Sequence, residues 1–248
     1  GLFSNSPFKN GKLSGFETYR AHVWTQTDPD RTGIPKFLTE KSMSFEQYVD
    51  YALKVPVYAV IRNSNYYNCT EFTFSELLEG KNENFNPEDI TIEDWINHIS
   101  TIFTEVRLKT FIEMRGADAG NYNSLCALPA FWTGILYQKE ALDEAYNIIS
   151  DFTYEDLMNF RTDVISKGLD ARYGKTNGWA LAERFLNISF KGLKKRDQKN
   201  LYGDDETVYL DYLSKVIAKK ENASRKAIQL YFSDEVLKIK ELFKGESF

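Results

Sequence analysis

The sequence predicts an α+β protein, with strands and helices mixed in the first half and helices alone in the second. Two observations support this prediction. Short runs with alternating apolar residues occur only before residue 137, whereas apolar residues beyond it recur at helical spacing. We therefore predict a region 1–137 that carries a sheet and its loops, followed by a helical region 138–248, with the two packed as one unit.

Local signals define the elements of the first half. Ser44 and Thr73 each precede a Gln or Glu at the third helical position, which is the pattern of a capping box, and Thr91 precedes Asp94 in the same way. An apolar, β-branched run before a polar stretch is typical of a hairpin. The predicted elements are a short helix at 16–24, a helix at 45–53, a hairpin of strands at 55–62 and 66–70, a short helix at 74–79 and a helix at 92–99.

Charged and apolar residues alternate from Arg107 to Arg115, which predicts a single β-strand. One face carries Glu113 among the cations Arg107, Lys109 and Arg115, and the other face is apolar. A glycine turn at 116–120 and a nearly continuous apolar helix follow. This arrangement favours a rigid platform for charged chemistry, and the alternative is an edge strand with a surface ion pair.

Beyond Gln138, amphipathic helical patterns follow one another without internal repeats. They cover 141–152, 154–167, 180–195, 206–220, 224–232 and 235–243.

Composition limits the class of protein. Of the 248 residues, 42% are hydrophobic and 27% are charged, and the net charge is −5, which argues against a general binder of nucleic acid or of anionic membranes. Cys69 and Cys126 are the only cysteines, which favours a reducing compartment. We expect no signal peptide and no membrane span, and therefore predict a cytoplasmic protein. His22 and His98 lack the spacing of a zinc site.

Five blocks of the sequence occur in an order that is specific to one family. They are SNSPF, YRAHVWTQTDPDRTG, FEQYVDYALKVPVY, DWINHISTIFTEVRLKTFIEMRGADAG and LCALPAFWTGILY. With these blocks, the chain resembles the glutamate–cysteine ligases of the plant and α-proteobacterial type. The resemblance implies a glutamine synthetase-like antiparallel sheet packed with helices. Family members are much longer, so the chain resembles their C-terminal half, and the N-terminal half of the same enzyme would be its partner.

The resemblance implies a reaction driven by ATP. The γ-carboxylate of glutamate is phosphorylated to an acyl phosphate, and the amine of cysteine then displaces phosphate, which is the first step of glutathione biosynthesis. The implied partners are glutamate, cysteine and ATP, and the implied cofactor is Mg²⁺. Because Mg²⁺ prefers oxygen ligands, Glu113 is the predicted metal ligand. Arg115 is a predicted catalytic residue, since a planar guanidinium suits a transferring phosphoryl group.

The other blocks supply further candidates. The resemblance places YRAHVWTQTDPDRTG at the substrate or nucleotide end of the site, so Arg20 and Arg31 are predicted to bind carboxylate or phosphate, and Arg31 is also a catalytic candidate. Thr32 and Trp24 are predicted to line the same pocket. Arg107 is a predicted binding residue because of its strand face. Exposed surface arginines are the alternative for Arg20 and Arg31.

One stretch departs from the family. Better-known members have Gly-Pro-Trp-Arg-Arg where this chain has GNYNS at 120–124, and their tryptophan lies against the bound glutamate. Tyr122 is the residue predicted to provide an aromatic wall here. The departure leaves two alternatives open, namely a carboxylate–amine ligase of the same fold that uses another amine, and a non-catalytic binding module that retains the fold.

Overall fold

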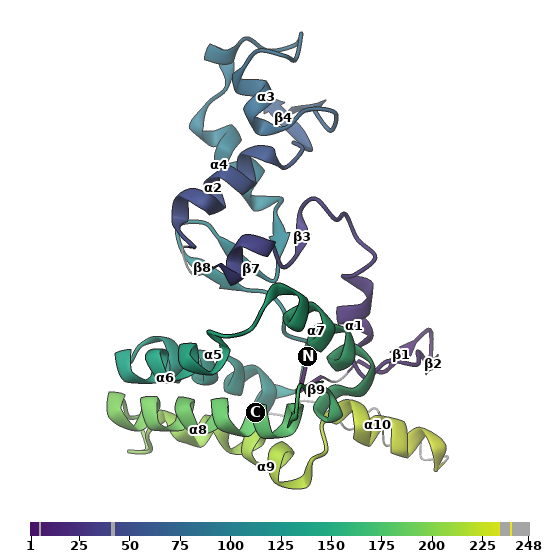
Figure 1. Cartoon of the computed structure of the whole chain (residues 1–248), viewed down its shortest axis with the longest axis vertical. Helices are drawn as coiled ribbons and strands as arrows, with labels where there is room; N and C mark the ends of the chain where they lie inside the picture. The colour runs from purple at the N-terminus through teal and green to yellow at the C-terminus, as the bar shows by residue number, and fades with distance from the viewer. Residues whose placement is uncertain (5, 41–42, 234–238, 240–248) are drawn as a thin grey trace. The chain divides into compact units, whose positions relative to one another are not determined.

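The structure, a computed structural model, describes residues 1–4, 6–40, 43–233 and 239, and it confirms an α+β protein (Figure 1). The chain forms two compact units, which we describe separately. Unit 1 comprises Gly1–His22 and Ala117–Phe248, and unit 2 comprises Val23–Gly116. The sequence led us to expect a division after residue 137, but the chain leaves unit 1 after His22 and returns to it at Ala117.

Unit 2 combines short helices with two-stranded sheets. Its helices are η1 (Lys36–Thr39), α2 (Phe45–Lys54), α3 (Phe74–Leu78), η2 (Pro87–Asp89) and α4 (Ile92–Ser100). Its strands are the parallel pair β3 (Thr32–Gly33) and β6 (Phe103–Thr104) and the antiparallel pairs β4 (Ala59–Arg62) with β5 (Asn65–Asn68) and β7 (Val106–Leu108) with β8 (Ile112–Met114).

Local side-chain signals set the ends of these elements. Ser44, Thr73 and Thr91 form the predicted capping boxes of α2, α3 and α4. The predicted hairpin is confirmed with shorter strands, and its turn residues Asn63 and Ser64 both have positive φ. Two such residues match a two-residue hairpin turn that follows the twist of the strands.

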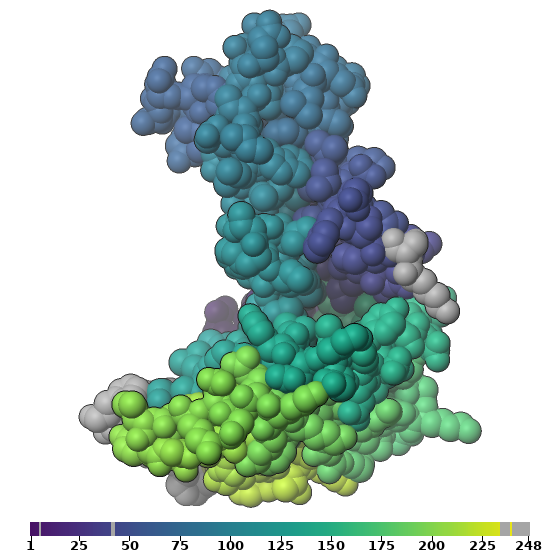
Figure 2. Space-filling view, turned by 90° about the vertical axis from the view of Figure 1, so that its left-hand side faces the viewer, coloured from purple at the N-terminus to yellow at the C-terminus, as the bar shows by residue number. Residues whose placement is uncertain are grey.

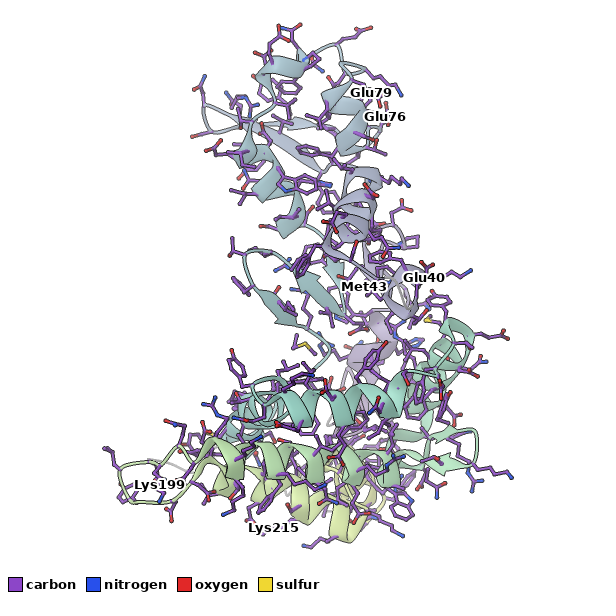
Figure 3. All side chains as sticks on the ribbon, turned by 60° about the vertical axis from the view of Figure 1, so that its left-hand side comes forward. Glu40, Met43, Glu76, Glu79, Lys199 and Lys215 are labelled. Atoms are coloured by element: carbon purple, nitrogen blue, oxygen red, sulfur yellow. The ribbon has the colours of Figure 1, made fainter. Side chains whose placement is uncertain are left out.

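The core of unit 2 lies beneath α2, α3 and α4 and is rich in aromatic residues. Its buried members include Val57, Val60, Phe74, Leu77, Phe85 and Ile102. On the surface of α3, Glu76 and Glu79 lie close together (Figure 3), and Lys81 pairs with both carboxylates. Surface pairs of this kind contribute little to stability.

The predicted single strand from Arg107 to Arg115 is wrong. The segment forms the hairpin β7–β8, in which Arg107 lies opposite Glu113. The turn between the strands is Lys-Thr-Phe, closed by a hydrogen bond from Lys109 N to the carbonyl of Phe111, at 2.9 Å. This turn could not be predicted, because it contains none of the Gly, Asn, Asp or Pro residues that mark turns.

Unit 1 is mainly helical, as predicted for the second half of the chain. Its strands are β1 (Phe8–Lys9) with β2 (Lys12–Leu13) and β9 (Arg172–Tyr173) with β10 (Thr176–Asn177). Its helices are α1 (Tyr19–Val23, whose last residue opens unit 2), α5 (Tyr122–Leu136), α6 (Lys139–Ile149), α7 (Tyr154–Lys167), η3 (Gly168–Asp170), α8 (Gly178–Arg196), η4 (Glu206–Leu210), α9 (Asp211–Lys219) and α10 (Ala223–Phe232). The helix predicted at 235–243 falls almost entirely outside the described residues.

Helices α5 and α8 pack closely because small residues face each other. A Cβ atom at Gly134 would collide with the backbone carbonyl of Ser189, and one at Gly192 would collide with the carbonyl of Gly134. The Ser189 hydroxyl donates to the carbonyl of Phe131 at 2.9 Å, so the polar group at this contact is satisfied. Figure 2 shows residues of α8 in light green at the surface of unit 1. Within the described residues, no helix is both long and apolar enough to cross a membrane.

Candidate active site

The hairpin β7–β8 places the Glu113 carboxylate between two guanidinium groups. Arg107 donates from Nε to Glu113 Oε2 at 2.6 Å, and its Nη2 lies 2.6 Å from the same oxygen. Arg115, two residues along the strand, donates from Nη1 to that oxygen at 3.3 Å. The cross-strand pairing of residues 107 and 113 explains the first contact, and the two-residue period of a strand explains the second.

The Glu113 carboxylate is charged and partly open to solvent. Partial burial opposes ionisation, but the charge and hydrogen bonds of Arg107, aided by Arg115, hold the pKa of Glu113 below its ordinary value. Its side chain is 32% exposed. All the guanidinium contacts fall on Oε2, so within the described part of the chain Oε1 has no protein partner.

Aromatic rings border the guanidinium of Arg115. Its Cζ lies 5.2 Å from the ring centre of Phe103 and 6.0 Å from that of Trp24. Sequence reasoning included Trp24 in the predicted pocket but missed Phe103. The missed signal is that Phe103 directly precedes the hairpin and lies on β6, the strand that pairs with β3.

A second carboxylate, that of Glu105, lies near the end of the same hairpin. The backbone N–H of Arg115 donates to the carbonyl of Glu105 at 3.0 Å, which extends the ladder by one pair. The side chain of Glu105 lies against Gly116, where an added Cβ would be 2.8 Å from Oε2. The hairpin end therefore gathers two carboxylates and two arginines, and a glycine leaves room for one of the carboxylates.

Arg31 and Thr32 lie in unit 2 but are engaged by the protein itself. The side chain of Arg31 is almost fully buried and donates to Asp28 Oδ2 (2.7 Å), Thr101 Oγ1 (3.1 Å) and the carbonyl of Pro56 (2.7 Å). The Thr32 hydroxyl donates to the carbonyl of Asp28 at 2.7 Å. These contacts differ from the ligand-binding role that we predicted for Arg31, and they favour a role in folding this loop.

Arg20 and Tyr122 belong to unit 1. The backbone N–H of Arg20 donates to the Ser6 hydroxyl at 3.3 Å. That hydroxyl in turn donates to Asp118 Oδ2 at 2.7 Å. Thus the Asp of EMRGAD is tied to the SNSPF block, a link that the sequence reasoning missed. Tyr122 is the first residue of α5 and is 41% exposed, and its hydrogen bond with Cys126 raises its pKa.

Comparison with known proteins shows the family to which this chain is similar. The model of the family described as Glutamate-cysteine ligase family 2 (GCS2) matches residues 1–239. This chain belongs to that family. The chain is 42% identical over 230 residues to the chloroplastic glutamate–cysteine ligase of Medicago truncatula, covering 93% of this chain and 44% of that protein. It is also 42% identical to the chloroplastic glutamate–cysteine ligase A of Oryza sativa subsp. indica, covering 93% and 46%. The chain thus spans less than half the length of these ligases.

The comparison also corrects the predicted location. The ligases of Medicago truncatula, Oryza sativa and Brassica juncea that this chain matches are all named chloroplastic, so the cytoplasmic prediction is wrong. It rested on a low cysteine count and the lack of a long apolar run. Those features indicate a reducing compartment and the absence of a span, but they do not separate one such compartment from another.

The predicted Mg²⁺ site can be tested against the donors of this ligase-family chain. Among the described residues, no three His, Cys, Asp or Glu side chains come together in a way that could hold a metal ion. Glu113 nevertheless offers Oε1, a hard anionic oxygen, and its side chain on β8 is partly exposed. Mg²⁺ commonly keeps several waters and binds through one or two carboxylates plus substrate phosphates. The residues present therefore fit one ligand of such an ion.

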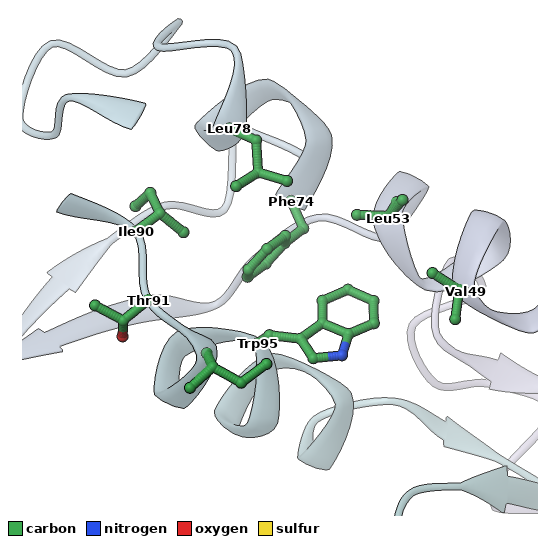
Figure 4. Close-up of a pocket in the computed structure, with 8 residues that line it drawn as sticks. Val49, Leu53, Phe74, Leu78, Ile90, Thr91 and Trp95 are labelled. Atoms are coloured by element: carbon green, nitrogen blue, oxygen red, sulfur yellow. The ribbon is translucent and has the colours of Figure 1, made fainter. Parts of the chain in front are cut away.

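A separate hollow in unit 2 is apolar and does not fit this chemistry. It has a volume of about 280 Å³ and lies between α2, α3 and α4 (Figure 4). Its lining consists of Val49, Leu53, Phe74, Leu78, Ile90, Thr91, Ile92 and Trp95. Since no charged side chain lines it, the hollow cannot neutralise phosphates or carboxylates, and the charged hairpin remains the candidate site.

Proposed function

We propose that this chain is part of an ATP-dependent ligase that joins the γ-carboxylate of L-glutamate to the amine of L-cysteine. The observation that carries the proposal is the Glu113 carboxylate held between Arg107 and Arg115, in the EMRGAD block of a chain that belongs to the glutamate–cysteine ligase family. Because the chain spans under half of its relatives, the activity is proposed for the complete polypeptide, whose remaining part is the expected partner.

The proposed reaction has two displacements. An oxygen of the glutamate γ-carboxylate attacks the γ-phosphorus of ATP, and ADP leaves with the electrons of the broken bond. The neutral amine nitrogen of cysteine then attacks the acyl carbon of the γ-glutamyl phosphate, phosphate leaves, and the nitrogen loses a proton. Both steps concentrate negative charge on phosphoryl oxygens, so fixed positive charge accelerates them.

Arg115 and Glu113 take the roles that the geometry permits. Arg115 stabilises the transferring phosphoryl group, because its guanidinium lies at the hairpin end, beside the Glu113 carboxylate that it contacts at 3.3 Å. Glu113 Oε1 serves as one Mg²⁺ ligand, with water, ATP and the remaining polypeptide completing the set. The ion, when bound, neutralises charge on the ATP phosphates.

Two further parts of the proposal come from the family resemblance. Arg20 is proposed to bind the glutamate carboxylate or a phosphate, and Tyr122 is proposed to take the place of the tryptophan of better-known members. The glutamine synthetase-like sheet is proposed for the complete polypeptide. The described residues form only two-stranded sheets, so further strands would come from the remaining part of the protein.

The test is release of ADP from Mg·ATP by the purified chain, with glutamate and cysteine supplied separately and together. Release that requires both amino acids, and that is lost in Glu113→Gln, is the expected result. If the chain alone is silent, the assay is repeated with the longer polypeptide from the same gene. Loss of the requirement for cysteine when another amine is supplied would favour the alternative ligase, which the GNYNS departure motivates. Silence of the longer polypeptide as well would favour the non-catalytic module.

A further inference from the structure

Every nitrogen of the Arg107 guanidinium has a partner within unit 2. Nε and Nη2 both contact Glu113 Oε2, and Nη1 donates to the carbonyls of Ser100 and Ile102. The side chain is only 9% exposed. Four of its five N–H groups are thus directed at protein oxygens, and the low exposure leaves the guanidinium little room to reach a phosphate or a substrate carboxylate.

The carbonyls that hold Arg107 are themselves fixed. Ser100 is the last residue of α4, where unsatisfied carbonyls and the helix dipole favour a cation. Ile102 is fully buried in the core of unit 2. Arg107 therefore connects the end of α4 to the carboxylate of Glu113 across the hairpin. The position of that carboxylate is thus fixed relative to the core of unit 2.

We propose that Arg107 is a positioning residue, which holds Glu113 by Oε2 so that Oε1 is presented to the metal ion, and that it does not itself bind substrate or nucleotide. This inference rests on the proposed function, in that Glu113 is taken as a metal ligand. It reassigns Arg107 from the binding role that its strand face suggested. A lysine at this position could keep the charge but not the contacts, because one ammonium cannot contact Glu113 Oε2 and also reach the two carbonyls of Ser100 and Ile102.

The experiment is a double-mutant cycle read out as Mn²⁺ affinity. Mn²⁺ in the presence of ATP replaces Mg²⁺, since its electron spin resonance signal distinguishes bound from free ion. The four proteins are the complete polypeptide as parent, Arg107→Lys, Glu113→Gln and the double variant. Groups that orient a metal ligand typically contribute 10- to 100-fold in affinity. We expect Arg107→Lys to weaken Mn²⁺ binding about 10-fold in the parent and less than 2-fold in the Glu113→Gln background.

Arg62→Lys is the matched control. Arg62 also lies in unit 2 and also joins a carboxylate, that of Asp94, to the carbonyls of Ile61 and Asp89. It should cost stability in urea without changing Mn²⁺ affinity. If Arg107→Lys does not fold, Arg107→Gln keeps one donor for the carbonyls and replaces it in the cycle.

The outcomes separate two claims, that Glu113 is a metal ligand and that Arg107 positions it. Equal loss of affinity from Arg107→Lys with and without Glu113, or no loss at all while Glu113→Gln abolishes binding, overturns the positioning role and leaves Glu113 as a ligand. A complete polypeptide that binds no Mn²⁺ in the presence of ATP, or a Glu113→Gln variant that binds it normally, overturns the ligand assignment and the positioning role together.

Discussion

Two arginine–carboxylate pairs in unit 2, Arg62–Asp94 and Arg107–Glu113, use the same groups but differ in which carboxylate oxygens are bonded. Arg62 contacts both oxygens of Asp94, each at 2.7 Å, and Asp94 Oδ2 also accepts from the backbone and hydroxyl of Thr91. The Asp94 side chain is 4% exposed. Glu113, in contrast, receives all its contacts on one oxygen and is 32% exposed.

The difference shows that an arginine–carboxylate pair can either stabilise the fold or leave a carboxylate oxygen available for a ligand. We call the Arg62–Asp94 pair closed and the Arg107–Glu113 pair open. At Asp94 the protein uses both carboxylate oxygens, so there is nothing left for a ligand and the pair serves the fold. At Glu113 two arginines share one oxygen, which keeps the carboxylate charged, and the other oxygen makes no contact with a described residue. Substitution should therefore destabilise the protein much more at the Asp94 pair than at the Glu113 pair.

The largest effect is expected at the closed pair. Asp94→Ala leaves Arg62 without its carboxylate and removes the acceptor of the Thr91 N–H at the start of α4. Breaking a buried pair by deleting one partner costs about 3 kcal/mol. Urea denaturation of the purified chain measures the free energy of unfolding. A loss below about 1 kcal/mol would mean that this pair is as dispensable as an ordinary surface pair.

Next in size is the acid sensitivity of the same pair. Burial opposes ionisation of Asp94, but the hydrogen bonds of Arg62 and Thr91 hold the pKa of Asp94 below its ordinary value. A carboxyl with a depressed folded-state pKa contributes stability that is complete above its unfolded pKa, about 4, and is lost as the pH falls through its folded pKa. We expect the urea concentration at the midpoint of unfolding to decrease as the pH is lowered below about 4, and to decrease less in Asp94→Asn. Parallel profiles for the two proteins would remove this pair from the acid response.

The open pair should matter less for stability. Glu113→Ala removes a partly exposed carboxylate, and Arg107 keeps its two carbonyl partners, so the expected cost is about 1 kcal/mol. The same urea titration measures it beside Asp94→Ala. A cost equal to that of Asp94→Ala would show that Glu113 is also a structural joint, and the contrast between the two pairs would fail.

How much of this the sequence foretold depends on how far apart the interacting residues lie. The capping boxes at Ser44, Thr73 and Thr91 were predicted because both partners sit within three residues of each other. The Arg62–Asp94 pair spans 32 residues and the contact of Arg31 with Pro56 spans 25, so nothing local marked them. This is why Arg31 was predicted as a ligand-binding residue and found buried.

The candidate site itself was predicted in composition but not in geometry. Glu113 and its two arginines were identified from their alternation and from the EMRGAD block, whereas the hairpin that brings residues 107 and 113 face to face was missed. In a single strand, Arg107 would lie six residues from Glu113, about 20 Å away at the usual rise, and could not hold it. The turn at Lys109–Phe111 therefore creates the site, although no residue in it signals a turn.

The smallest effect concerns Gly116, at the end of this hairpin. A methyl group there would meet the Glu105 carboxylate at 2.8 Å, and since the atom it meets ends a side chain and is not backbone, a small shift of that carboxylate relieves the contact. Gly116→Ala should therefore change the free energy of unfolding by under about 0.5 kcal/mol. If Glu105 contributes to the charged end of the site, however, the same variant should weaken Mn²⁺ binding in the presence of ATP. Glu105→Gln is the matched comparison, because it removes the charge without filling the space. Loss in both variants would extend the open site from one carboxylate to two, and loss in neither would confine it to Glu113.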